Sequence, residues 1–223
     1  MPGGIVFEFP DQYLFPSGLW ITIQLSLLSL LGSLVLGTLI AVLRVSPLAP
    51  LRWIGAGYVE FFRNTPLLVQ LFFLYFATPY VGIYLGTPET FAFNAALLGL
   101  ALYHAAYVGE VVRGGLIGVE HGQIEAARSL GLSYLQTLRF VQLPQTFRSV
   151  VPPLGNIAIA LVKNSSLAAT IGVAEVLFAG EIVESRTFRA DEAYGSVALL
   201  YLLLTIPMGI GVNWLERRLV VAR

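Results

Sequence analysis

Long apolar segments restrict the fold of this chain more than any other feature of its sequence. Five of them reach about the 20 residues that a helix needs to cross a bilayer, at approximately 19–43, 53–77, 91–112, 151–173 and 193–215. The chain is 57% hydrophobic and only 12% charged, whereas about 25% of an average soluble domain is charged. We expect an all-α polytopic membrane protein with five transmembrane helices, forming a single domain over residues 1–223.

Several classes of function are excluded by what the sequence lacks. It has no cysteine for a disulfide or a thiolate metal site, and two histidines are too few for a histidine-rich metal site. A net charge of zero argues against a nucleic-acid partner. The sequence contains no G-x-x-x-x-G-K-[ST] phosphate-binding loop and no H-E-x-x-H, C-x-x-C or G-x-S-x-G pattern. We therefore expect a chain that is not an enzyme and that has no catalytic residue, metal or cofactor of its own.

Basic residues predict the orientation of the helices, because cytoplasmic loops carry an excess of lysine and arginine. No lysine or arginine precedes Arg44, whereas Glu8 and Asp11 do, so a signal peptide is not expected and the first apolar segment is a retained span. The opposite loops contain only Arg186 and Arg189. The N-terminus is thus predicted outside and the C-terminus in the cytoplasm. The arginines expected on the cytoplasmic side are Arg44, Arg52, Arg113, Arg128, Arg139, Arg148, Arg217, Arg218 and Arg223.

The second apolar segment allows two interpretations. Pro47 and Pro50 separate it from the first segment, so its beginning could be an elbow helix at the membrane interface. Alternatively, residues 53–77 form one kinked span with a proline inside it. Arg63 and Asn64 stand just before the Thr65-Pro66 pair, and a residue before proline avoids the α conformation. A helix broken at this polar patch would expose backbone groups to a solute, unless the patch is only a solvated helix start.

Four adjacent polar residues interrupt the fourth apolar segment: Lys163, Asn164, Ser165 and Ser166. A lysine at this depth costs roughly 2.5–3.5 kcal/mol on insertion scales. Lys163 could snorkel or pair with a carboxylate, and the amide and hydroxyl groups could join helices. We favour a role in lining a pathway, because four polar residues at one level exceed what packing requires.

The third apolar segment carries His104, Tyr107, Glu110 and Arg113 at a spacing of three residues. This spacing brings neighbours together on one helix, so Glu110 and Arg113 are expected to pair at the helix end, near a cytoplasmic gate. His104 lies deepest. It is either a satisfied core histidine, whose ring nitrogens are hydrogen-bonded within the protein, or a residue that contacts a solute.

A polar unit between the third and fourth segments is predicted to form two short helices. Ser133 and Gln136 have the spacing of a capping box, and Gly131 can adopt the positive φ where the first helix stops. We expect Pro144 to end the second helix. The unit reads E-A-A, three residues, G, nine residues, a β-branched residue, one residue and L-P.

This spacing resembles the EAA loop of ATP-binding cassette importer permeases. The resemblance implies a coupling helix that docks into a groove on an ATP-hydrolysing subunit; the alternative is a hairpin that only links two spans. Val141 stands where the family's loop often has isoleucine. The residues implied in coupling are Glu125, Ala126, Ala127, Gly131, Leu143 and Pro144.

Further phrases are similar to the polar amino acid permeases of these importers, and closest to the glutamate/aspartate type. They are FFRNTPLLVQLFFLYF, YHAAYVGEVVRGGL, EAARSLGL and LVKNSSLAATIGVAEV. The resemblance implies a permease in the bacterial inner membrane, working as a homo- or heterodimer. It also implies two ATP-binding subunits that hold ATP and Mg, and an external solute-binding protein.

Charge suggests the substrate class. Lys163 and Arg63 supply two potential positive charges within the apolar segments. The only acidic residues expected at a comparable depth are Glu60 and Glu110, and both lie near the cytoplasmic ends of their segments. Surplus positive charge favours an acidic or amide amino acid over a basic one. An ion-coupled secondary carrier, an intramembrane enzyme and a permease for basic amino acids are the alternatives. The predicted substrate-binding residues are Lys163, Asn164, Ser165, Ser166, Arg63, Asn64, His104 and Tyr107.

Overall fold

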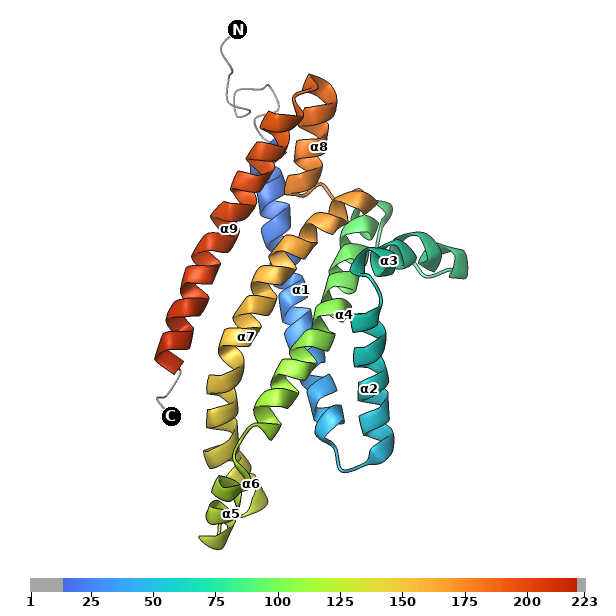
Figure 1. Cartoon of the computed structure of the whole chain (residues 1–223). Coiled ribbons are helices and arrows are strands. Elements are labelled where there is room, and N and C mark those ends of the chain that lie inside the picture. Colours follow the sequence, from blue (N-terminus) through green and yellow to red (C-terminus); the bar gives the residue numbers. More distant parts are fainter. Residues whose placement is uncertain (1–13, 220–223) are drawn as a thin grey trace.

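The computed structural model describes residues 14–219, and every regular element in that range is a helix. Four long helices run roughly along the long axis of the molecule (Figure 1): α1 (Leu14–Val45), α4 (Pro88–Ile117), α7 (Leu143–Asn164) and α9 (Ala190–Leu219). Within the described residues, four helices are long and apolar enough to cross a membrane. The all-helical class is therefore confirmed. Glu8, Asp11 and Arg223 lie outside the described residues.

The second predicted span is not one continuous helix. It is divided into α2 (Ala49–Asn64) and α3 (Leu67–Phe72), followed by a π-helical turn η2 (Phe73–Ala77) and a 3-10 turn η3 (Thr78–Val81). The break falls at Thr65, whose φ of −107° and ψ of 137° are extended, as expected for a residue that precedes proline. The expected number of five transmembrane helices is therefore slightly too high for the described residues, in which four helices are long and apolar enough to cross a membrane. Since α2 packs along α1 and α4 (Figure 1), it is not a separate elbow.

The polar unit has the predicted caps but a different end. It contains α5 (His121–Ser129) and α6 (Tyr134–Thr137). The capping box of Ser133 and Gln136 is present, and Gly131 has a φ of 86°, so both predictions are confirmed. Pro144 does not end a helix, because it lies in the first turn of α7. A π-helical turn η4 (Leu138–Gln142) precedes it and joins α6 to α7.

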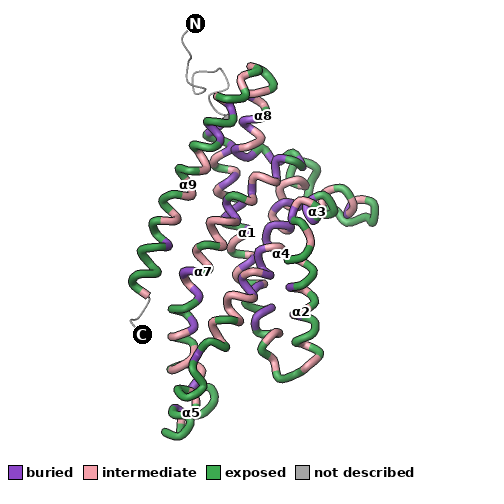
Figure 2. The backbone as a smooth tube through the Cα atoms, in the orientation of Figure 1, coloured by how far each residue is buried: buried purple, intermediate pink, exposed green. Residues whose placement is uncertain are grey.

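Small residues hold the centre of the molecule together. A Cβ added at Gly37 of α1 would lie 2.5 Å from the Cβ of Val108 in α4, and one added at Gly109 would lie 3.1 Å from Ile40. Such contacts let two helix backbones approach closely, which is how membrane helices associate. The buried residues concentrate on α1 and α4, whereas α9 is mainly exposed (Figure 2).

The two ends of the molecule differ. The start of α1 and the short helix α8 (Val176–Thr187) lie at one end, and α5 and α6 lie at the other (Figure 1). We call these the α8 end and the α5–α6 end. Helices α1, α4 and α9 finish toward the α5–α6 end, so their terminal arginines gather there. These are Arg44, Arg113, Arg217 and Arg218.

Candidate functional site

A polar layer lies about halfway along the molecule, where three elements meet. The end of α2 brings Arg63, the middle of α4 brings His104 and Tyr107, and the end of α7 brings Asn164. At this point α7 passes into the 3-10 helix η5 (Ser165–Ile171), so the change in helix type falls within the predicted polar cluster. We define the polar layer as these residues together with Lys163 and Tyr103.

His104 joins α4 to α7. Its side chain is 2% exposed. Nδ1 lies 2.9 Å from the carbonyl oxygen of Leu100, and Nε2 lies 3.2 Å from the amide nitrogen of Asn164. Because the carbonyl can only accept, Nδ1 must donate to it, which leaves Nε2 to accept from Asn164. His104 is thus bonded within the protein on both ring nitrogens, which favours the satisfied core histidine over a direct solute contact.

Arg63 and two tyrosines form the other side of the layer. The guanidinium of Arg63 lies 5.4 Å from the centre of the Tyr107 ring, within cation–π distance. The hydroxyls of Tyr103 and Tyr107 lie 2.9 Å apart. Tyr103 was missed in the sequence, although its position four residues before Tyr107 places both on one face of a helix. The break in the second span therefore brings Arg63 to the middle third of α4.

The remaining predicted residues divide into exposed and locally bonded groups. Lys163 is exposed, at the last turn of α7. Ser166 donates to the carbonyl of Lys163 at 2.8 Å, so its hydroxyl is used by its own helix. Asn64 donates to Glu60 at 2.8 Å on the surface of α2 rather than toward the layer. Ser165 is fully buried and donates to the carbonyl of Val162 at 2.8 Å.

The break between α2 and α3 is braced by Gln70. Its amide nitrogen lies 3.1 Å from the carbonyl oxygens of Phe62 and Thr65 and 2.7 Å from the Thr65 hydroxyl. These carbonyls have lost their helical partners at the break. Gln70 therefore compensates for the interrupted helix and keeps Arg63 in place.

The predicted pair of Glu110 and Arg113 is confirmed, with an N–O distance of 2.8 Å. Arg44 of α1 also approaches Glu110, at 3.3 Å. The carboxylate therefore links two membrane helices toward the α5–α6 end. It has cationic partners of its own and does not belong to the polar layer.

One acidic residue was misplaced by the sequence analysis. Glu60 and Glu110 are the only acidic residues that the sequence pattern predicts at depth, and Glu175 is not among them. The structure shows Glu175 completely buried, at the N-terminus of α8, with its carboxyl group between Thr22 and Tyr201 of two membrane helices. The apolar residues on both sides of it, Val173 and Val176, were the available sign that it turns inward.

The residues predicted to act in coupling lie at the far end of the molecule from Glu175 (Figure 1). Glu125 and Ala126 are exposed on α5, whereas Ala127 is buried beneath them. The turn after α5 presents large apolar side chains to the outside: Leu130, Tyr134 and Leu135 are 82%, 64% and 71% exposed. Exposed apolar side chains grouped at a polar tip are typical of an interaction surface.

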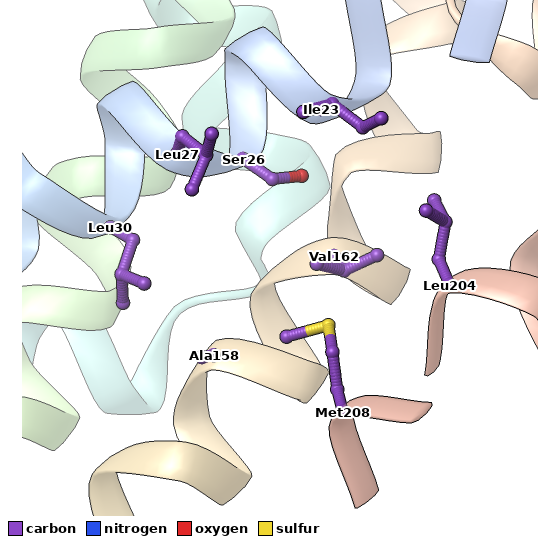
Figure 3. Close-up of a pocket in the computed structure, with 8 residues that line it drawn as sticks. All are labelled: Ile23, Ser26, Leu27, Leu30, Ala158, Val162, Leu204 and Met208. Carbon is purple, nitrogen blue, oxygen red and sulfur yellow. The ribbon is translucent and has the colours of Figure 1, made fainter. Parts of the chain in front are cut away.

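A groove of about 290 Å³ between α1, α7 and α9 is an unsuitable site for a polar solute (Figure 3). Among the side chains that line it, Ser26 supplies the only oxygen, and the others are hydrocarbon or thioether. A charged amino acid there would leave its charges without partners, at a high cost in free energy. The lining residues are Ile23, Ser26, Leu27, Leu30, Ala158, Val162, Leu204 and Met208.

Comparison with known proteins gives a consistent result. A probable glutamine ABC transporter permease protein of Bacillus subtilis is 41% identical over 211 residues, covering 95% of each chain. A glutamate transport system permease protein of Corynebacterium efficiens is 38% identical over 217 residues, covering 92% of this chain and 93% of that protein.

Among solved structures, the crystal structure of an amino acid ABC transporter with histidines contains a chain that is 34% identical to this one. It superposes with a TM-score of 0.88, covering 98% of this chain and all of that chain. The family described as binding-protein-dependent transport system inner membrane component matches residues 13–221. The chain belongs to this family and is a permease subunit of an ABC transporter rather than an enzyme.

Proposed function

We propose that this permease imports an acidic or amide amino acid, such as glutamate, aspartate or glutamine, and that the polar layer contacts it. The observation that carries the proposal is a pair of cations. Among residues 14–219, neither Lys163 nor Arg63 has a carboxylate within ion-pair distance, although both lie in the polar layer. A solute carboxylate would supply the missing partner, and charge-assisted hydrogen bonds are the stronger kind.

The carboxylates near the layer already have partners. Glu60 accepts from Asn64, and Glu110 is held between Arg44 and Arg113. The layer therefore offers positive charge and neutral donors such as the Tyr107 hydroxyl, but no carboxylate for a cationic side chain. The relatives named for glutamine and for glutamate support this class equally.

Membership of the ABC permease family also suggests the other subunits of the transporter. We propose two ATPase subunits that bind ATP and Mg, a second permease subunit and an external solute-binding protein. The exposed apolar side chains of Leu130, Tyr134 and Leu135 would seat in the ATPase subunit. The arginines at the α5–α6 end support a cytoplasmic position for that end and an N-terminus outside. Transport would proceed by alternating access, driven through the α5–α6 turn.

Uptake competition tests the substrate class. The complete transporter is reconstituted in vesicles, and labelled glutamine uptake is measured with excess glutamate, aspartate or arginine. We expect the two acidic amino acids to compete and arginine not to. Lys163→Ala should lower uptake about tenfold or more, since a lost charge-assisted contact costs about 1.5–3 kcal/mol. Lys163→Arg is the matched control, because it keeps the charge.

Two results would contradict the proposal. If arginine or histidine competes as strongly as glutamate, a basic amino acid is the better substrate. Such a result would agree with the related structure of an amino acid ABC transporter with histidines. Normal uptake by Lys163→Ala would show that the lysine does not contact the solute and has only a structural role.

A further inference from the structure

Glu175 lies outside the polar layer, yet it joins three helices. Its Oε1 accepts hydrogen bonds from the backbone N–H groups of Leu177 and Phe178, at 2.7 and 3.0 Å. Its Oε2 accepts from the hydroxyl of Tyr201 in α9, at 2.5 Å, and of Thr22 in α1, at 3.4 Å. We call Glu175, Thr22 and Tyr201 the Glu175 hub. A single carboxyl group thus binds the start of α8 to α9 and to α1.

The backbone around Glu175 is also held tightly. The Thr22 hydroxyl accepts a hydrogen bond from the N–H of Val176 at 3.2 Å. A Cβ added at Gly18, one turn earlier in α1, would lie 3.0 Å from the carbonyl carbon and oxygen of Glu175. No side chain fits there without movement, so α1 packs directly on the backbone of this residue. The position of α8 is therefore fixed by side-chain and backbone contacts together.

The hub reaches the polar layer through helix η5, which begins at Ser165 and ends at Ile171, shortly before Glu175. Ser165 directly follows Asn164, which contacts His104. The α-helical backbone changes to the 3-10 form at this junction, so the position of Asn164 depends on how η5 is held. Helix η5 packs against both α1 and α8, the elements that the hub joins.

We propose that Glu175 is a positioning residue for transport, which sets the place of Ser165 and Asn164 in the polar layer by fixing the helices α1 and α8 on which η5 packs. The proposal rests on the polar layer being the solute site, as argued above, but it does not depend on which amino acid is carried. Loss of a hub contact changes how well the layer receives the solute. It leaves untouched the α5–α6 end, where ATPase subunits would dock.

The test measures KM and maximal rate of glutamine uptake in vesicles, together with ATPase activity without solute. Tyr201→Phe removes one oxygen, and we expect it to raise KM about fivefold, the effect of one lost hydrogen bond, with the basal ATPase activity unchanged. Glu175→Ala should raise KM further. Glu175→Gln should restore a KM close to wild type, because its amide oxygen can accept from both N–H groups and its nitrogen can donate to the hydroxyls.

Thr205→Val is the matched control. Thr205 also lies on α9, but its hydroxyl donates only to the carbonyl of Tyr201 in its own helix, at 2.8 Å. We expect wild-type KM for this variant. If Tyr201→Phe likewise keeps wild-type KM per inserted complex, the hub has only a structural role and the proposal is overturned.

Two other outcomes are possible: Glu175→Ala fails to insert, or the transporter carries a basic amino acid. If Glu175→Ala does not insert, Tyr201→Phe decides alone, because it leaves the other three donors of Glu175 in place. A wild-type complex that imports arginine but not glutamine would refute the substrate class. The same KM comparison made with arginine would then still support or overturn the role of Glu175.

Discussion

Gly131 provides a selective test of coupling, because its substitution introduces strain without a clash. Its φ is 86°, and a Cβ added to it would have no heavy atom within 4 Å. A valine there costs free energy only through the left-handed backbone, roughly 1–2 kcal/mol. Since every 1.4 kcal/mol is a tenfold change in an equilibrium constant, the population of the native turn relative to other forms falls about 5- to 30-fold.

We expect Gly131→Val to insert normally but to lose most of its ATPase association and uptake. The assay is co-purification of the ATPase subunit with the permease from detergent, at matched membrane levels, followed by uptake in vesicles. Gly131→Asn should retain both, because asparagine tolerates the left-handed region. Gly122→Val is the matched control: it also has free space around it, but its φ is not positive.

Full ATPase association and wild-type uptake in Gly131→Val would show that the α5–α6 turn is only a linker. Equal losses in Gly131→Val and Gly122→Val would show that any bulk on this tip disturbs the interface, so that the backbone conformation of Gly131 is not the cause.

Two further predictions concern the fold. Single cysteines at the exposed Thr87 and Ser129 should react with impermeant reagents from opposite sides of the membrane; labelling from one side would disprove the proposed topology. Gly37→Leu should sharply lower the yield of folded protein, because its side chain would collide with Val108. Overpacking of this kind typically costs about 1–3 kcal/mol of stability. Gly57→Leu is the control and should express normally, because a Cβ at Gly57 has no neighbour within 4 Å. Similar thermal stability of the two variants would contradict the packing argument.

Features that depend on neighbours along the chain were predictable from the sequence. The capping box of Ser133 and the turn at Gly131 need only residues within one helical turn. The pair of Glu110 and Arg113 is also local, at a spacing of three residues. The long helices were found for the same reason, since an apolar run of sufficient length identifies a span by itself.

Other features depend on how the chain compensates for a local defect. Pro144 lacks an N–H, and the sequence suggested that it ends a helix. In the structure the N–H of Leu143 bonds to the carbonyl of Leu138, and this wider π-helical turn leads directly into α7. At Thr65 the opposite happens: the extended backbone persists, and the Gln70 side chain satisfies the freed carbonyls. A proline identifies both places where a helical hydrogen bond is lost. Whether the helix continues there depends on the surrounding structure.

Burial by distant segments leaves only a weak sign in the sequence, such as the apolar residues that flank Glu175. Glu175 has the composition of an outer loop around it, and its contact with Thr22 joins residues 153 positions apart. Among residues 14–219, His104 and Glu175 are the two deeply buried titratable residues, and the protein uses the hydrogen-bonding capacity of both. The groups left to recognise a solute carboxylate are therefore the cations that have no carboxylate partner among the described residues. In the polar layer these are above all the cations of Lys163 and Arg63, which is why their substitution, rather than that of His104, is the decisive test of the substrate class.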